Sequence, residues 1–508
     1  MIYALTEQGV RRAEQRVVDE LGLSLAELMR RAGHALAEEA MSGAPYGAVA
    51  VVTGKGNNGG DGWVAARALT GSGRDVTVYT PAAPDELEGL AGEAAGEAVS
   101  AGVAFEVTDG PMAFDALRGN AVVIDALFGI GFSGPVRPPY VTWIEAINAS
   151  GARVVAADLP SGVETDTGRV GELAVEADVT VTFSAPKVGL LLYPGAMHAG
   201  HVKVADIGIP WDFLGEDGDV ELWSPGDYAA LVPRPAPDAH KGSRGRVLIV
   251  AGSGSYPGAA VLAAMGAQRM GAGYVALAVP ESIAPIIQTK LTSAVVVGLP
   301  ENPSHTLASK VTEEILDVAK EFDAVVLGPG MTVAHGAVLV ARKLVSELSA
   351  PLVVDADGLN ALVDAVGSLT ARSAPTVVTP HPGELARLLD TTTSEVQADR
   401  LANAARLAGP RFTCVLKGAH TIVSGRDRLV LNTSGSPALA TAGTGDVLAG
   451  MVGALLAQGL EPLEAGTLAV YVHGRAGEHA AAASTEISVT AEDVPGFVAP
   501  ALAELLGR

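Results

Sequence analysis

Continuous apolar runs that end in glycine or aspartate restrict the fold of this chain more than any other feature. Three of them, residues 48–54, 121–129 and 153–162, lie in the first half of the sequence. Strands that are apolar at every position are covered on both faces, which is typical of a parallel sheet between two layers of helices. The segments between these runs have helical character. The first half of the chain therefore predicts a doubly wound α/β domain.

A second series of such runs begins at Arg246. Its members start at residues 246, 273, 323, 351, 376 and 412, so a second parallel sheet is expected there. Between Trp211 and Arg246 the pattern gives way to glycine, acidic residues and proline, a composition that predicts a linker. A chain of 508 residues exceeds one ordinary core, and two domains are expected, residues 1–217 and 218–508.

Net charge and cysteine content exclude several classes of protein. A formal net charge of −23 argues against nucleic acid and anionic membranes as partners, although backbone N–H groups can still bind phosphate locally. The single cysteine, Cys414, excludes an intrachain disulfide framework and lies in an apolar run, where packing is its expected role. The sequence shows no secretory signal and no apolar run of about 18 residues. A cytoplasmic location is expected.

Residues 54–62, Gly-Lys-Gly-Asn-Asn-Gly-Gly-Asp-Gly, follow a strand and open a helix. Glycines there let the backbone approach a ligand, and a helix N-terminus offers unpaired N–H groups to phosphate. The dinucleotide fingerprint is formally present at Gly54, Gly56 and Gly59, but the next strand ends at Thr80 without the acidic residue that would bind ribose. Ordinary binding of a hydride-transfer cofactor is therefore not predicted.

Two more strand ends carry acids, Asp125 and Asp158. The carboxyl ends of parallel strands line one crevice, so these loops should converge with the loop around Asn57. Asparagine, aspartate and serine oxygens without cysteine or histidine suit a hard cation such as potassium or magnesium. Each aspartate taken alone can equally cap a helix or turn.

Residues 1–215 resemble the NAD(P)H-hydrate epimerase family, a Rossmann-like domain. The resemblance implies potassium ligands at Asn58, Asp125 and Ser161, and Asp158 is the candidate for proton transfer at the inverting carbon. It also implies contacts with the hydrated nucleotide at Asn57, Asn58, Gly59, Gly60, Asp61, Gly129, Ile130, Gly131, Phe132, Ser133, Gly134, Pro135 and Asp158.

The second half contains Ala-Thr-Ala-Gly-Thr-Gly-Asp at residues 440–446, before a helical stretch at 447–458. Small residues at a helix start form an anion pocket, and Asp446 at its rim can take a proton from an attacking hydroxyl, although it can also be a simple N-cap. Gly252 to Gly258 either cradles phosphate or makes a tight turn. His381 and Glu384 follow a strand; Glu384 is expected to orient a magnesium-bound water, and His381 is equally explained as a turn residue.

Residues 221–508 resemble the ribokinase-like ADP/ATP-dependent NAD(P)H-hydrate dehydratase family. The motifs are His240-Lys-Gly-x-x-Gly, Gly328-Pro-Gly, Asp355-Ala-Asp-Gly-Leu-Asn, Pro-His-Pro-Gly-Glu at 380–384 and Gly443-Thr-Gly-Asp. The resemblance implies Asp446 as the base. It implies hydrate contacts at Ala259, Gly330, His381 and Asp446, and adenine nucleotide contacts at Lys417, Gly418, Ala419, His420, Thr421 and Gly445.

The predicted activity is repair of hydrated nicotinamide nucleotides, NADHX and NADPHX. One domain interconverts the R and S epimers, and the other dehydrates the S epimer with ADP, or less favourably ATP, as phosphoryl donor, giving AMP and phosphate. A homo-oligomer is expected. Two alternatives stay open. A small-molecule kinase shares the Gly-Thr-Gly-Asp pocket, and a nucleotide sensor would bind without turnover.

Overall fold

The computed structural model describes residues 2–108, 110–215 and 219–508. Two compact units divide the chain, Ile2–Val220 and Glu221–Arg508. The predicted boundary between 217 and 218 falls outside the described residues. Within the part of the chain that the structure describes, no helix is long and apolar enough to cross a membrane.

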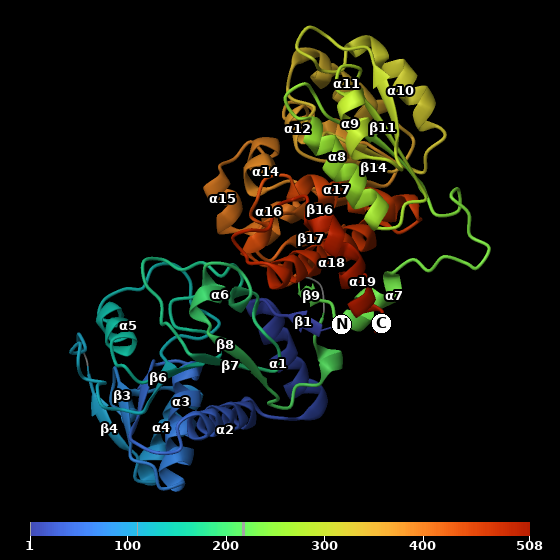
Figure 1. Ribbon diagram of the computed structural model, residues 1–508. Helices are drawn as coiled ribbons and strands as arrows, with labels where there is room; N and C mark the ends of the chain where they lie inside the picture. The colour runs from blue at the N-terminus through green and yellow to red at the C-terminus, as the bar shows by residue number, and fades with distance from the viewer. Residues whose placement is uncertain (1, 109, 216–218) are drawn as a thin grey trace. The chain divides into compact units, whose positions relative to one another are not determined.

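The N-terminal unit is built on a parallel sheet in the order β4-β3-β2-β5-β6-β7-β8 (Figure 1). The strands of this sheet are β2 (Val49–Thr53), β3 (Val76–Thr80), β4 (Ala104–Val107), β5 (Val122–Ala126), β6 (Arg153–Ala157), β7 (Val179–Phe183) and β8 (His201–Ala205). The short strand β1 (Ile2–Ala4) lies outside this sheet. The helices of the N-terminal unit are α1 (Glu7–Leu21), α2 (Leu25–Gly43), α3 (Asn57–Gly71), α4 (Gly89–Ser100), α5 (Tyr140–Asn148) and α6 (Gly195–His198).

Helices cover both faces of this sheet, as its continuous apolar strands predict. In the central strand β2, Val49 and Val51 pack into a core with α2, α3 and α4, while Val52 packs on the other face with Trp143 of α5. Every residue of β2 and β5 is buried. The strand order reverses between β2 and β5, and loops at the carboxyl ends of such strands form the usual ligand crevice of a doubly wound sheet.

The C-terminal unit has strands in the order β9-β18-β17-β16-β15-β14-β13-β10-β11-β12. All neighbours from β12 to β16 are parallel, and β17 is antiparallel to β16 and β18. The strands are β9 (Val220–Leu222), β10 (Arg246–Val250), β11 (Tyr274–Pro280), β12 (Val295–Leu299), β13 (Ala324–Leu327), β14 (Leu352–Val354), β15 (Thr376–Val378), β16 (Phe412–Leu416), β17 (Ile422–Ser424) and β18 (Leu429–Leu431).

The helices of this unit are α7 (Pro225–Leu231), α8 (Pro257–Arg269), α9 (Ala284–Lys290), α10 (Thr312–Ala319), α11 (His335–Glu347), α12 (Asp357–Asn360), α13 (Val366–Thr370), α14 (Pro382–Leu388), α15 (Thr393–Ala398), α16 (Arg400–Ala405), α17 (Thr444–Ala457), α18 (Pro462–Ala483) and α19 (Val494–Leu505). Both units therefore confirm the predicted α/β class with parallel sheets.

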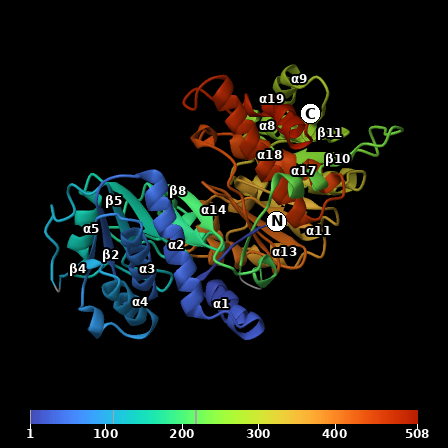
Figure 2. The same cartoon turned by 90° about the horizontal axis from the view of Figure 1, so that it is seen from below.

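Glycines allow α17 to pack directly on α8 (Figures 1 and 2). A Cβ added at Gly450 would lie 1.9 Å from the carbonyl oxygen of Ala263, and one added at Gly266 would lie 2.1 Å from the carbonyl oxygen of Val447. Neither helix can shift away without exposing buried surface. This contact fixes the N-terminal end of α17, where Asp446 lies.

The predicted linker between Trp211 and Arg246 is partly wrong, because it contains strand β9 and helix α7. The start of α7 has a capping box in which Ser224 and Asp227 exchange side-chain and backbone hydrogen bonds, with Pro225 at the first helical position. Serine followed by proline and, two residues later, aspartate is a signal for the start of a helix. The prediction rested on composition and therefore did not detect it. Residues 233–239 carry no helix or strand.

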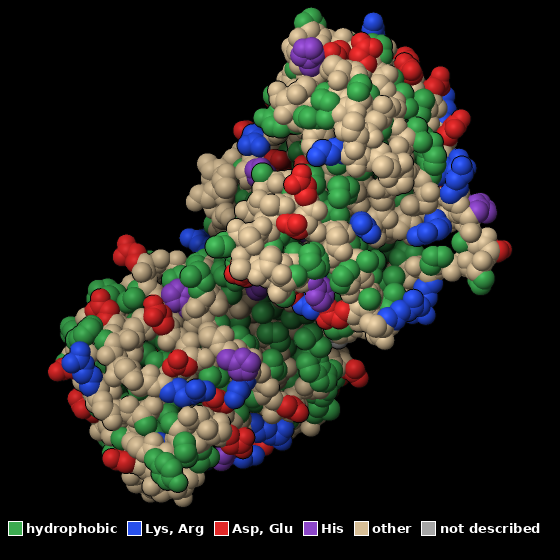
Figure 3. Space-filling model, viewed as in Figure 1, with side chains coloured by type: hydrophobic (Ala, Val, Ile, Leu, Met, Phe, Trp, Pro, Cys, Tyr) green, Lys and Arg blue, Asp and Glu red, His purple; other side chains and the backbone are tan. Residues whose placement is uncertain are grey.

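Acidic and basic side chains are interspersed on the face of the molecule that Figure 3 shows. Figure 3 shows basic side chains scattered among acidic ones there, rather than gathered into one continuous basic patch.

Candidate active sites

A cavity of about 670 Å³ opens at the carboxyl ends of β2, β5 and β6. Nine of the predicted residues line it: Asn57, Asn58, Asp61, Gly129, Ile130, Gly131, Phe132, Ser133 and Asp158. The predicted Gly134 and Pro135 do not line it. Neither do Gly59 and Gly60, whose missing side chains serve packing: a Cβ would lie 2.1 Å from the Gly54 carbonyl oxygen and 2.6 Å from Met29, respectively.

Residues Asn57 to Asp61 form the first turn of α3 rather than a loop. The first N–H groups of an α-helix have no intrahelical partner. Gly56, which precedes α3, has no side chain that could cap them. Asn57 and Asn58 line the cavity at this end. A phosphate of a nucleotide is the kind of group that such a helix start binds.

The predicted potassium ligands come together beside this cavity. Ser161 Oγ donates to Asp125 Oδ1 at 2.7 Å, and the Ser161 N–H donates to Oδ2 at 2.8 Å. Backbone of Phe128 joins this pair to Asn58: the Phe128 N–H donates to Ser161 Oγ at 2.9 Å, and Asn58 Nδ2 donates to the Phe128 carbonyl at 3.0 Å. Burial raises the pKa of the Asp125 carboxyl to about 6 despite the Ser161 hydrogen bonds. A cation would offset that buried charge.

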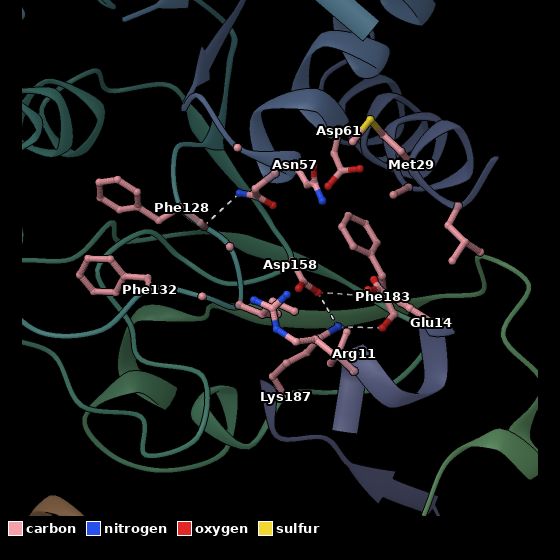
Figure 4. Close-up of a pocket in the computed structure, with 18 of the residues that line it drawn as sticks. Arg11, Glu14, Met29, Asn57, Asp61, Phe128, Phe132, Asp158, Phe183 and Lys187 are labelled. Carbon is pink, nitrogen blue, oxygen red and sulfur yellow. Dashed lines mark hydrogen bonds and ion pairs between the residues drawn. The ribbon is translucent and has the colours of Figure 1, made fainter. Parts of the chain in front are cut away.

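Asp158 forms an ion pair that the sequence analysis missed. Lys187 Nζ lies 2.5 Å from Asp158 Oδ1, and both side chains are buried (Figure 4). The Thr182 hydroxyl and the Phe183 N–H also donate to that oxygen, each at 3.1 Å. Asp158 has a φ of 66°, a left-handed conformation that costs energy in a residue with a side chain. Such strain at a cavity wall is common in functional sites.

Two further acids face the same cavity, Glu14 of α1 and Asp61 of α3 (Figure 4). Burial raises the pKa of Asp61 well above its usual range, and the Asp158 and Glu14 carboxylates raise it further. Burial and Asp158 likewise raise the pKa of Glu14. Lys187 lies four residues past the end of β7. Its position after a strand end is the sequence signal that could have identified it as a site residue. Glu14 sits on a helix with no such signal.

In the C-terminal unit, Asp446 lies in the first turn of α17. Gly443, with a φ of 99°, is the N-cap residue, so Asp446 is not the N-cap that the alternative reading required. Burial raises the pKa of the Asp446 carboxyl to about 7, with Asp355 as the next contribution. A carboxyl with a pKa near neutrality suits a general base.

Lys417 lies beneath this turn. Its Nζ is 2.8 Å from Asp355 Oδ1 and 3.9 Å from Glu384 Oε2. A Cβ at Gly445 would be 3.2 Å from Lys417 Nζ, so this glycine lets the helix start approach the ammonium group. Burial opposes the charge of Lys417, yet Asp355 and Glu384 raise its pKa. The structure thus joins the end of β16 to the Asp355 motif, a link that spacing did not reveal.

His381 and Glu384 form the start of α14. The Glu384 carboxylate accepts the His381 N–H at 2.8 Å, and His381 Nδ1 accepts the N–H groups of Gly383 and Glu384. Because Nδ1 accepts, the neutral ring carries its proton on Nε2. Burial lowers the pKa of His381, and burial raises that of Glu384.

The other predicted positions lie in two places. Ala259 and Gly330 are neighbours, since a Cβ at Gly330 would be 2.8 Å from that of Ala259. Residues Gly418 to Thr421 form the turn between β16 and β17, where Arg400 donates to the Ala419 carbonyl at 2.6 Å. Gly418 and His420 have φ values of 131° and 52°. This turn adjoins Lys417 directly.

A buried histidine that the sequence did not single out supports α17. His473 of α18 lies 3.0 Å from the Thr444 carbonyl through Nε2. Burial lowers the pKa of His473 to about 4, so the ring is neutral at pH 7 and donates to this carbonyl. It therefore holds the turn that carries Asp446.

Comparison with known proteins finds matches to both units. Residues 247–496 match the NAD(P)H-hydrate dehydratase family, and residues 25–189 match the family described as YjeF-related protein N-terminus. The chain is 42% identical to the bifunctional NAD(P)H-hydrate repair enzyme of Thermofilum pendens, over 97% of this chain and 94% of that one. It is 39% identical to the Salinibacter ruber enzyme of the same name, over 99% and 97%.

A solved structure supports the fold of the C-terminal unit. The crystal structure of the ADP/ATP-dependent NAD(P)H-hydrate dehydratase from Bacillus subtilis, co-crystallized with ATP and Mg²⁺, matches with a TM-score of 0.50 and 28% identity. It covers 56% of this chain and 99% of that one.

Proposed function

Because this chain belongs to the family of bifunctional NAD(P)H-hydrate repair enzymes, we propose that its two units carry out two successive repair reactions. The C-terminal unit dehydrates the S epimer of hydrated NADH or NADPH at the expense of ADP, with ATP as the alternative donor. The N-terminal unit converts the R epimer to the S epimer. The observation that supports this proposal most strongly is the position of Asp446, at the start of α17 and near Lys417.

The dehydratase chemistry converts a poor leaving group into a good one. Asp446 takes the proton of the ring hydroxyl, whose oxygen attacks the terminal phosphorus of ADP, and the P–O bond to AMP breaks. The lone pair of the ring nitrogen then expels phosphate from the carbon, and loss of a proton from the neighbouring carbon restores the dihydronicotinamide ring. The N–H groups at the start of α17 and the Lys417 ammonium stabilise the negative charge of the transferring group.

The remaining site residues have positioning roles in this proposal. Ala259 and Gly330 form one wall against the hydrate, and His381 presents its Nε2 proton. The turn from Gly418 to Thr421, together with Gly445, holds the adenine nucleotide. Magnesium supplies charge neutralisation on the nucleotide phosphates, and Glu384 is the carboxylate that would orient one of its waters.

Asn58, Asp125 and Ser161 are proposed to hold potassium. Their donor atoms are oxygens of the type a hard cation prefers, and the buried Asp125 carboxylate needs a compensating charge. The ion would keep the loops after β5 and β6 together. A cytoplasmic location and a homo-oligomeric state stay predictions.

The decisive experiment supplies the purified chain with an epimer mixture of hydrated NADH or NADPH, magnesium, potassium and either ADP or ATP. We expect the absorbance of the reduced nucleotide to return in full, with one inorganic phosphate released per molecule repaired. A stable phosphoester would identify a kinase, and binding without turnover would identify a sensor. With Asp158→Asn, recovery should stop near the S fraction of the mixture. With Asp446→Asn, it should not begin.

A further inference from the structure

The cavity of the N-terminal unit holds carboxyl groups in two different electrostatic states. Asp158 receives a buried ammonium, a hydroxyl and a backbone N–H on one oxygen. These are the contacts of a carboxylate, since a protonated acid would lose the ion pair with Lys187. Asp158 is therefore equipped to accept a proton.

Asp61 has the opposite surroundings. Its side chain comes from α3, is only 9% exposed and lines the same cavity. Within residues 2–108, 110–215 and 219–508, no hydrogen bond or ion pair reaches its carboxyl group. Burial, followed by the Asp158 and Glu14 charges, raises the pKa of Asp61 well above its usual range. Burial and the two neighbouring carboxylates therefore favour the protonated form of Asp61.

Figure 4 places these two carboxyl groups on different walls of the cavity, Asp61 from α3 and Asp158 from the loop after β6. Glu14 of α1 lies on the side of Lys187. A flat ring bound between the walls would present one face toward Asp61 and the other toward Asp158. Inverting a carbon needs a proton donor and a proton acceptor on opposite faces.

We propose that Asp61 and Asp158 act as a donor and acceptor pair in the inversion, an inference that rests on the epimerase activity proposed above. Asp61 protonates the departing hydroxyl, the C–O bond breaks, and the ring nitrogen lone pair forms a C=N⁺ bond. Water adds to the opposite face, its proton passes to Asp158, and the electron pair returns to nitrogen. Solvent then returns the proton from Asp158 to Asp61 before the next turnover. The other epimer reacts by the same steps in reverse, with the protonated Asp158 as donor and the ionised Asp61 as acceptor.

Lys187 and Glu14 set the direction of this pair. The Lys187 ammonium forms an ion pair with Asp158 Oδ1 at 2.5 Å, while burial and the Asp158 and Glu14 charges raise the pKa of Asp61. Arg11 also lines the cavity and lowers the pKa of Glu14. Lys55 and Tyr140 are the other titratable residues that line this cavity.

The test uses the full-length chain, a single epimer of hydrated NADH and no adenine nucleotide, so that only epimerisation is measured. Initial rates of conversion are followed by chromatography. We expect Asp61→Asn to lower kcat about 100-fold or more, with KM changed by less than about threefold. Asp61→Glu should restore part of kcat. Asp85→Asn, the same change at an exposed acid outside the cavity, should leave the rate unchanged.

Three further readouts separate proton donation from a structural role. In ¹⁸O-labelled water, the wild-type chain should place one solvent oxygen on the ring carbon for each inversion. Its kcat should fall as pH rises through the pKa of Asp61, because the donor must be protonated, and Asp61→Asn should lack this decrease. Removing the buried acid should also leave the thermal unfolding temperature at pH 7 equal or higher.

Failure of the donor and acceptor pair and failure of the proposed epimerase function give different results. Undiminished kcat in Asp61→Asn, or inversion without ¹⁸O uptake, would overturn the donor and acceptor pair while the epimerase activity stands. No conversion of either epimer by the wild-type chain would overturn the proposed function itself.

Discussion

Asp446 offers the sharpest test of the dehydratase site, because its pKa of about 7 lies within the range of ordinary assays. The base must be ionised to accept the proton of the ring hydroxyl. At about pH 6 roughly a tenth of Asp446 is ionised, and at about pH 8 roughly nine-tenths. We therefore expect kcat/KM for dehydration to rise about tenfold between these values and to level off above them.

The same shift has a consequence for stability. A rise from 3.8 to about 7 corresponds to roughly 4 kcal/mol of disfavoured ionisation. Because the pKa of this acid is raised on folding, its penalty is absent below the unfolded value, grows between about pH 4 and 7, and is complete above 7. Asp446→Asn should therefore stabilise the C-terminal unit at pH 8, by up to about 4 kcal/mol, while lowering dehydration by about 100-fold or more.

The assay pairs return of reduced-nucleotide absorbance, from the S epimer with ADP and magnesium, with denaturant unfolding at pH 5 and 8. The matched control is Asp317→Asn, the same change at an exposed acid. This control should dehydrate at the wild-type rate and should show no gain in stability. A flat rate between pH 6 and 8, or wild-type dehydration by Asp446→Asn, would refute the assignment of Asp446 as the base.

Other outcomes follow from the same geometry. Asp158→Asn should slow epimerisation by about 100-fold or more while the S epimer is still dehydrated at the wild-type rate, as single-epimer assays would reveal. Lys187→Met leaves the Asp158 carboxylate buried without its cation, and we expect it to destabilise the N-terminal unit by about 3–5 kcal/mol in urea unfolding. Gly450→Ala should force α17 and α8 apart, because its Cβ would lie 1.9 Å from the Ala263 carbonyl oxygen. A loss of about 1–3 kcal/mol or more in the C-terminal unit is expected, and unchanged stability would contradict this close packing.

The sequence was informative wherever local patterns carried the signal. Continuous apolar runs predicted the central strands of both sheets, because a strand covered on both faces has no room for polar side chains. Exposed edge strands such as β4 lack that signal, since all four of its residues are exposed. Helix α7 was missed because its short capping sequence lies among prolines and acidic residues.

Residue types at strand ends likewise identified Asp125 and Asp158 as candidates, because the carboxyl ends of parallel strands meet at one edge. Asp446 was identified by the small residues that precede it at a helix start. The lysines that form ion pairs in the two sites could not be identified from the sequence. Lys187 is 29 positions from Asp158, and Lys417 is 62 positions from Asp355. Nothing in the spacing of either pair marks it as an ion pair.

The amino-acid sequence alone determined the class of fold, the two-part organisation and the positions where small and acidic residues meet helix starts. These follow from short-range rules on side-chain size and backbone freedom. Only the tertiary structure decided which acids are buried with their pKa raised and which acid is paired with an ammonium group. Protonation depends on burial and on charges brought close by folding, and residues distant in the chain supply both.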